Sequence, residues 1–168
     1  MFSKFKSLVF LFLVLFLSCK VFTKAQEIEK AYQVEREENL REEIADFADD
    51  QLGRKYKYAG RSPKSGFDCS GFTHYVLKNS GITLPTSSAA QAMEGVIKKL
   101  KESEPGDLVF FKRGGKGRVF HVAMIYENQG GNPKVIHSTS SRGVVIDELL
   151  TSKYWEPKIW QVRDVIGD

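Results

Sequence analysis

The pattern of apolar and polar positions divides the chain into three parts. Residues 8–17 are an unbroken apolar run, preceded by Lys4 and Lys6. Residues 20–38 are dominated by charged side chains with only scattered apolar ones, a composition typical of a solvated spacer. From Asn39 onward, apolar residues recur first with helical spacing and then with strand spacing. We therefore expect a globular domain over residues 39–168, joined to the apolar run by a charged tether over residues 20–38.

Helical spacing fills the first half of the expected domain. One helix begins near Leu40 and is predicted to end at Gly53; its buried face is formed by Leu40, Ile44, Phe47, Ala48 and Leu52. A second helix is predicted over residues 70–80, where Phe72, Tyr75, Val76 and Leu77 recur at helical spacing. A short third helix is expected over residues 87–93, with Ser87 or Ser88 as its N-cap.

Strand-like segments fill the second half, after the turn Pro105-Gly106. They are predicted at residues 107–111, 121–126, 134–137, 144–146 and 159–163. Glycine-containing turns separate most of them. Helices that precede a run of strands indicate an α+β fold, in which an antiparallel sheet packs against the helix at residues 70–80.

The N-terminal apolar run predicts export. About ten residues are too short to span a bilayer but match the core of a signal peptide. The run ends at Ser18-Cys19, similar to a loose bacterial lipobox, so we expect residues 1–19 to be a signal peptide and Cys19 to be lipidated. The protein would then be a membrane-anchored lipoprotein facing the periplasm or cell envelope. Cleavage near Ala25 with secretion, or an uncleaved interfacial anchor, are the alternatives.

Charge and cysteine content narrow the chemistry. Removing residues 1–19 removes two lysines and no acid, which lowers the net charge from +4 to +2. This balance, without an arginine-rich run, argues against nucleic acid as a partner. The chain has two cysteines. If Cys19 carries a lipid thioether, Cys69 is a free thiol in a compartment that tends to oxidise thiols, which suggests that it is kept for chemistry. We expect no cofactor and a monomer.

Cys69 lies in the glycine-bounded turn at residues 66–72, directly before a predicted helix. A helix N-terminus stabilises a thiolate through its unpaired N–H groups and macrodipole. We interpret Cys69 as a catalytic nucleophile. The alternative is a small buried apolar residue, the usual role of a lone cysteine.

A thiolate enzyme needs a base and a group that orients the base. His74 lies about 140° around the helix from Cys69 and is assigned to the helix surface. His121 opens an apolar strand after a glycine-rich loop and is the best base. His137 ends the next strand and would orient His121 if the register allows. Structural histidines are the alternative, and the paired ligand spacing of zinc sites is absent, so no metal is expected.

Four ordered blocks resemble the NlpC-type family of papain-like bacterial cell-wall cysteine peptidases across about residues 40–165. They are residues 52–56, 67–72, 105–111 and 121–126. The resemblance implies a papain-like fold, a triad of Cys69, His121 and His137, and hydrolysis of amide bonds in peptidoglycan stem peptides. It also implies substrate-binding or oxyanion roles for Tyr56, Asp68 and Ser70. The alternative is that Tyr56 is a core residue and that Asp68 and Ser70 are only helix caps.

Two departures from the family pattern bear on substrate detail. Tyr58-Ala59-Gly60 stands where relatives often have a tryptophan and two glycines, and Thr86 stands where they often have an arginine. The bond that is cut stays open between the γ-D-glutamyl bond to a diamino acid and the D-alanyl-diaminopimelate cross-link. A non-catalytic peptidoglycan-binding module of the same fold and a thiol acyltransferase acting on lipid are the alternative functions.

Overall fold

The computed structural model describes the backbone of residues 2–114 and 116–167, and the side chains of residues 22–114 and 116–167. The chain forms two units, residues 1–38 and residues 39–168. The predicted signal peptide and Cys19 fall outside the residues whose side chains are described. Their roles, and that of the charged tether, stay predictions.

Helix α1 (Phe2–Asp49) includes the segment predicted as a solvated spacer. The side chains of residues 22–36 are exposed, but the backbone is helical instead of irregular. Residues 2–49 contain no glycine or proline, and residues 20–49 include seven glutamates, a good helix former. Among the helices whose side chains are described, none is long and apolar enough to cross a membrane.

The end of α1 differs from the prediction. Ile44 and Ala48 are fully buried, as expected for the core face, but Leu52 is 41% exposed. The helix ends at Asp49, four residues before Gly53, so the turn that follows carries Leu52 away from this face. Gly53 has a positive φ of 75°, and its N–H donates to the carbonyl oxygen of Val144. It therefore fixes the connection to the sheet instead of capping the helix.

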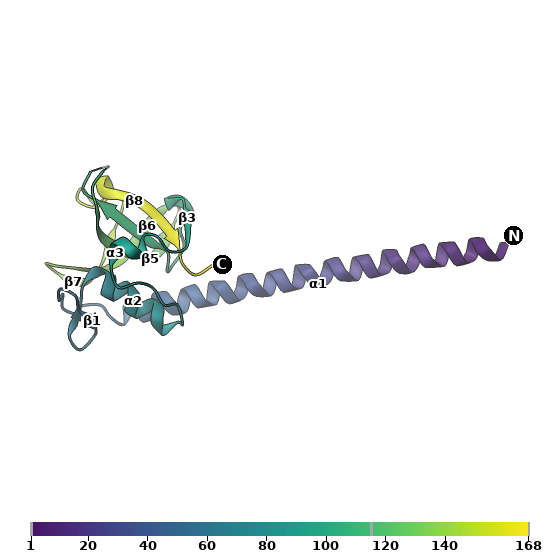
Figure 1. Ribbon diagram of the computed structural model, residues 1–168, viewed down its shortest axis with the longest axis horizontal. Helices are drawn as coiled ribbons and strands as arrows, with labels where there is room; N and C mark the ends of the chain where they lie inside the picture. Colours follow the sequence, from purple (N-terminus) through teal and green to yellow (C-terminus); the bar gives the residue numbers. More distant parts are fainter. Residues whose placement is uncertain (1, 115, 168) are drawn as a thin grey trace. The chain divides into compact units, whose positions relative to one another are not determined.

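The centre of the domain is a six-stranded antiparallel sheet with the order β3-β8-β4-β5-β6-β7 (Figure 1). The strands are β3 (Val96–Lys98), β4 (Leu108–Lys112), β5 (Val119–Gln129), β6 (Asn132–Thr139), β7 (Gly143–Glu148) and β8 (Ile159–Asp164). Five of them were predicted. β3 was not, because a three-residue edge strand has too little periodicity to detect. A small separate sheet pairs β1 (Arg61–Ser62) with β2 (Gly66–Phe67).

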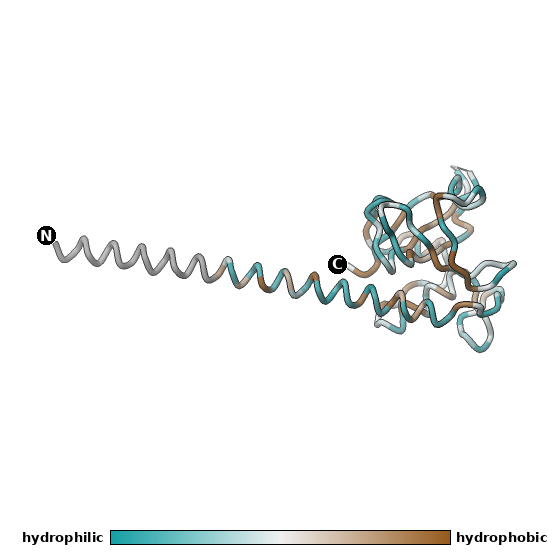
Figure 2. The backbone as a smooth tube through the Cα atoms, turned by 180° about the vertical axis from the view of Figure 1, so that it is seen from behind, coloured by the Kyte–Doolittle hydropathy of each residue, from teal (hydrophilic) through white to brown (hydrophobic). Residues whose placement is uncertain are grey.

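Helix α2 (Cys69–Asn79) packs against β5 and β6, and the short helix α3 (Ser88–Gln91) packs against β5. Between residues 39 and 167, the apolar stretches of the tube follow the strands and α2 (Figure 2). One face of the sheet, with Phe110, Val122 and Met124, forms a core with Phe72 and Val76 of α2. Side chains alternate between faces along a strand, so a second apolar cluster fills the opposite face.

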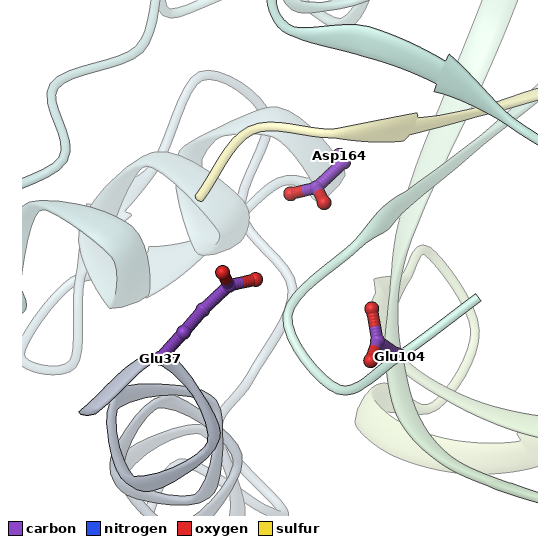
Figure 3. Close-up of side chains that lie close together, drawn as sticks. All are labelled: Glu37, Glu104 and Asp164. Atoms are coloured by element: carbon purple, nitrogen blue, oxygen red, sulfur yellow. The ribbon is translucent and has the colours of Figure 1, made fainter. Parts of the chain in front are cut away.

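A partly buried group of charges holds the last turns of α1 to the sheet. Arg41, whose side chain is 4% exposed, pairs with Asp107 at 2.9 Å and with Asp164 at 2.8 Å. Lys98 of β3 adds a second cation, 3.2 Å from Asp107. Figure 3 shows the carboxylates of Glu104, before β4, and Asp164, at the end of β8. We call these five residues the Arg41 ion cluster: Arg41, Lys98, Glu104, Asp107 and Asp164.

Candidate active site

Cys69 is the first residue of α2, and Asp68 is the N-cap. The Asp68 carboxylate accepts a 2.6 Å hydrogen bond from the Gly71 N–H, which fixes the first turn of the helix. Gly71 has no room for a side chain, because a Cβ would lie 2.0 Å from the carbonyl oxygen of Gly60. The glycine thus allows the loop before β1 to pass closely under the nucleophile turn, which holds Cys69 in place.

His121 and His137 come together from adjacent strands. The register pairs Met124 of β5 with Ile136 of β6, and this brings the two rings to one end of the strand pair. His121 Nε2 lies 3.1 Å from His137 Nδ1, and both rings are buried. The register requirement on which the sequence argument depended is therefore met, and the two histidines form a direct hydrogen bond.

A carboxylate continues this hydrogen-bonded line. His137 Nε2 lies 3.0 Å from Asp147 Oδ2, at the end of β7. Arg142 holds the same carboxylate with two bonds, Nη1 to Oδ1 at 2.9 Å and Nη2 to Oδ2 at 2.5 Å. We call these four residues the histidine network: His121, His137, Asp147 and Arg142.

Trp155 covers the histidine network on the face of the sheet opposite α2. Its ring stacks on His121 with 4.5 Å between centroids and 26° between planes. Its indole Nε1 donates to Asp147 Oδ2 at 3.2 Å. The indole therefore excludes water from one side of His121 and also adds a third donor group to the Asp147 carboxylate.

Cys69 and His121 line one pocket of about 840 Å³. Tyr56 and Arg113 also line it, together with the hydroxyl-rich segment at residues 138–141. This volume is within the usual range for a ligand site. Because hydroxyl and charged groups make up most of the lining, the pocket suits a polar substrate. The lipid substrate of the acyltransferase alternative would require an apolar opening.

Burial sets the resting protonation of the reacting pair. It raises the pKa of the Cys69 thiol, although backbone N–H groups of Val122 and Ser70 oppose this increase. It lowers the pKa of His121 to about 3, against the opposing charge of Asp147. The resting state is therefore a neutral thiol beside a neutral imidazole. The proton has to move to His121 as the sulfur attacks, a general-base step.

The two histidines leave few free donors for a metal ion. His137 uses both ring nitrogens, one toward His121 and one toward Asp147, and His121 uses Nε2. The remaining donors at this point of the described chain are His121 Nδ1 and the Cys69 sulfur. Two donors are fewer than the three protein ligands of ordinary catalytic zinc sites.

The model of the NlpC/P60 family matches residues 53–164, which contain Cys69, both histidines and the whole sheet. The chain belongs to the NlpC/P60 family. Its domain has the predicted α+β papain-like fold, with the cysteine at the start of a helix that packs on an antiparallel sheet. A crystal structure of an NlpC/P60 family protein from Bacillus cereus superposes with a TM-score of 0.69 at 36% identity, covering 76% of this chain and 40% of that one.

Two Bacillus relatives of this NlpC/P60 chain are longer than the chain itself. The chain is 37% identical over 126 residues to the gamma-DL-glutamyl hydrolase of Bacillus subtilis, covering 74% of this chain and 30% of the relative. It is 45% identical over 107 residues to the gamma-D-glutamyl-L-lysine dipeptidyl-peptidase of Bacillus cereus, covering 62% and 31%. The chain thus spans about a third of the length of these relatives.

Of the other residues singled out in the sequence of this NlpC/P60 domain, one lies at the pocket and three lie outside it. Tyr56 lines the pocket, and burial together with the nearby Cys69 raises the pKa of its phenol, which keeps the hydroxyl a donor. Asp68 and Ser70 do not line the pocket. Ser70 Oγ is within 3.1 Å of both Asp68 Oδ1 and the Thr86 carbonyl oxygen. Both side chains fix the nucleophile turn. His74 contacts the Leu84 carbonyl oxygen at 2.6 Å and is also outside the pocket.

Sequence reasoning missed Asp147, Arg142 and Trp155. Asp147 follows the predicted strand at residues 144–146, where a polar residue is ordinary. Its position becomes informative only once His137 is paired with Val145, because Asp147 is then diagonal to His137 on the same face. Trp155 lies in a connection with no strand or helix pattern. No local signal identified either residue.

Proposed function

We propose that this protein is a cysteine endopeptidase that hydrolyses amide bonds in peptidoglycan stem peptides. The observation that carries the proposal is the pairing of Cys69 at a helix N-terminus with His121 in one polar pocket, where His121 is hydrogen-bonded to His137. The names of the two Bacillus relatives support the substrate class, since both act on glutamyl bonds.

The reaction follows the thiol–imidazole pair. The Cys69 thiol gives its proton to Nδ1 of His121, and the sulfur attacks the scissile carbonyl carbon. His121 then protonates the leaving amine, which leaves a thioester on Cys69. Water attacks the thioester, His121 takes the proton of the water, and the carboxylate product departs as the thiol re-forms. The Tyr56 hydroxyl and the backbone N–H groups at the start of α2 are the proposed donors to the oxyanion.

The pocket lining contains one cation, Arg113, that is suited to a carboxylate of the peptide; its other arginine, Arg142, is paired with Asp147. Arg113 is exposed at the pocket, and stem peptides carry free carboxylates. The polar lining supports the peptidase over the thiol acyltransferase. The presence of both the cysteine and two hydrogen-bonded histidines supports an enzyme over a binding module, because a domain that only binds has no need of all three.

The N-terminal segment supports a location at the cell envelope. We propose that residues 1–19 direct export and that Cys19 is lipidated, which would attach the protein to a membrane through the tether at residues 20–38. The apolar run and its end at Ser18-Cys19 support this proposal. Cleavage near Ala25 would instead release a secreted protein.

The two cysteines of the chain provide a matched pair of variants. The full chain, purified in detergent, is incubated with sacculi and with a defined cross-linked muropeptide, and the products are identified by mass spectrometry. Wild type and Cys19→Ala should release stem-peptide fragments, whereas Cys69→Ala should release none. Equal release by Cys69→Ala would refute the cysteine mechanism, and binding without any products from wild type would favour the binding module.

The same variants test the anchor. Wild type and Cys69→Ala should fractionate with membranes and carry a lipid-sized mass increase, and Cys19→Ala should lose both properties. A soluble wild-type product that begins after Ala25 would replace the lipoprotein proposal with secretion. The masses of the muropeptide products also decide which of the two candidate bonds is cut.

A further inference from the structure

The carboxylate of Asp147 accepts hydrogen bonds from three side chains in the histidine network and its cover. Oδ2 accepts from His137 Nε2 at 3.0 Å, from Arg142 Nη2 at 2.5 Å and from Trp155 Nε1 at 3.2 Å. Oδ1 accepts the second Arg142 bond at 2.9 Å. Arginine and indole nitrogens can only donate, so two of the three partners of Asp147 require an acceptor.

These partners keep the carboxylate ionised. Burial alone would raise the pKa of Asp147, but the hydrogen bonds from His137 and Arg142 lower it far below its usual range. An ionised carboxylate has no proton to donate. The short contact with His137 must therefore consist of His137 Nε2–H donating to Asp147.

This direction of donation determines the tautomers of both histidines. A neutral imidazole that carries its proton on Nε2 has an unprotonated Nδ1, which can only accept. His137 Nδ1 therefore accepts from His121, and the proton of His121 lies on Nε2. The unprotonated nitrogen of His121 is then Nδ1, the atom that the proposed reaction uses as its base.

We propose that Asp147 is a positioning residue, which through His137 fixes the tautomer of His121 that leaves Nδ1 free for the thiol of Cys69. Arg142 and Trp155 hold the carboxylate in the required place and charge state. Asp147 acts through His137 and is not itself in contact with the reacting atoms. The inference rests on the proposed peptidase function, and it extends the predicted triad by a fourth side chain that the sequence did not reveal.

The direct test is spectroscopic and needs no substrate. Nitrogen-15 NMR of the full chain, labelled at histidine and kept in detergent, distinguishes protonated from unprotonated ring nitrogens. In the wild type, both His121 and His137 should be protonated on Nε2. In Asp147→Ala, His137 should populate both tautomers, because the acceptor that selects one has been removed. A wild-type His137 protonated on Nδ1 would overturn the inference whatever the activity.

The kinetic test uses Asp147→Ala and Asp147→Asn, with Glu127→Gln as the matched control. Glu127 is also a carboxylate on a strand of this sheet, paired with the cation Lys134 at 2.6 Å, but it lies outside the pocket. We expect kcat to fall at least about tenfold in both Asp147 variants, because an incorrect tautomer disables the base. Asp147 also lines the pocket, so the loss has to appear in kcat and not only in KM to support the positioning role. The control should retain wild-type kcat.

The outcomes separate the two proposals. If wild type releases no fragments, the proposed function fails, while the tautomer measurement still decides the role of Asp147. If wild type is active and Asp147→Ala is folded and equally active, the positioning role is refuted. If Asp147→Ala fails to fold, Asp147→Asn replaces it, since the amide is nearly isosteric and removes only the charge and one acceptor.

Discussion

The two polar groups of this domain, each with a buried centre and one exposed member, are built in opposite ways. In the Arg41 ion cluster, two permanent cations face three carboxylates. Arg41 links α1 to Asp107, just before β4, and to Asp164 of β8, and Lys98 of β3 pairs with the same two carboxylates. In the histidine network, a single arginine–carboxylate pair supports two imidazoles that are neutral at rest. One group joins segments distant in sequence; the other controls which ring nitrogen carries a proton.

The difference shows how a stabilising role of a buried charged group can be distinguished from a catalytic one. Every member of the Arg41 ion cluster already has a partner of opposite charge, and none of its residues lines the pocket. The histidine network ends in a ring that has one unpaired nitrogen and faces the pocket beside Cys69. Breaking the first should cost stability, whereas breaking the second should cost turnover.

The largest expected effect is on stability, from Arg41→Met. Removing one partner of a buried ion pair leaves the Asp107 carboxylate, which has 0% side-chain exposure, with Lys98 as its remaining cation. A loss of about 3–5 kcal/mol in the free energy of unfolding is expected. Urea unfolding followed by circular dichroism measures this loss, and turnover per folded molecule should be unchanged at a temperature where the variant stays folded.

Lys134→Met is the control for that prediction. Lys134 also pairs with a carboxylate, Glu127, but its side chain is 43% exposed, so the loss in the free energy of unfolding should be much smaller than in Arg41→Met. Equal losses in the two variants would mean that burial does not distinguish the Arg41 ion cluster from a surface pair. A large loss of turnover in folded Arg41→Met would remove the contrast with the histidine network.

The two groups also show what a sequence can predict. The Cys69 turn could be assigned because its determinants are local: an N-cap, two glycines and an apolar helical face within a dozen residues. His121 and His137 could be nominated by residue type, since histidine is the usual base, but their contact depended on the register of β5 and β6. Asp147 could not be assigned, because its contact with His137 depends on the register of β6 and β7. Arg41 could not be assigned, because its partner Asp107 is 66 residues away and only the folded domain brings the two together.

The error at Leu52 has a physical origin. Leu52 had the correct helical spacing for the core, but the helix ended three residues earlier and the turn exposed it. Residues 20–38 have the composition of a spacer, which is equally the composition of an exposed helix when glycine and proline are absent. Composition therefore did not reveal that their backbone is helical, and their role as a tether stays a prediction.

The free energy of unfolding should decrease at acid pH. Burial lowers the pKa of His121 from 6.5 to about 3 in the folded protein and lowers that of His137 as well. Below pH 6.5 the unfolded chain therefore binds protons that the folded chain does not, so stability falls as the pH falls through this range. The loss from His121 alone should be on the order of 2–3 kcal/mol at about pH 4.5, measured by urea unfolding at a series of pH values.

The sign of the pH dependence separates the histidine network from the buried Asp107 of the Arg41 ion cluster. Burial raises the pKa of Asp107 above 3.8, so this group makes stability rise as the pH falls through the range above 3.8, opposite in sign to His121. Backbone N–H groups and the nearby cations lower the pKa of Asp164 despite its burial, so its contribution is lost only as the pH falls below 3.8. His121→Asn should flatten the decline between pH 6.5 and 4.5, and His74→Asn should preserve it. If His121→Asn declines as steeply as the wild type, the neutral buried imidazole is not the source of the acid sensitivity.

The smallest effect on turnover is expected from Trp155→Phe. This variant separates the two contacts of the indole, its stacking on His121 and its hydrogen bond to Asp147. Phenylalanine retains an aromatic ring to stack on His121 but lacks the N–H that reaches Asp147 at 3.2 Å. Since Arg142 and His137 still hold the carboxylate, only one of its bonds is lost, and kcat should fall about fivefold, equivalent to about 1 kcal/mol. The melting temperature should shift by only a few degrees. If kcat is unchanged in Trp155→Phe and falls strongly in Trp155→Ala, Trp155 contributes through stacking and water exclusion. If kcat falls in both variants, part of the contribution comes from the hydrogen bond to Asp147, and Trp155 is then a further donor of the histidine network.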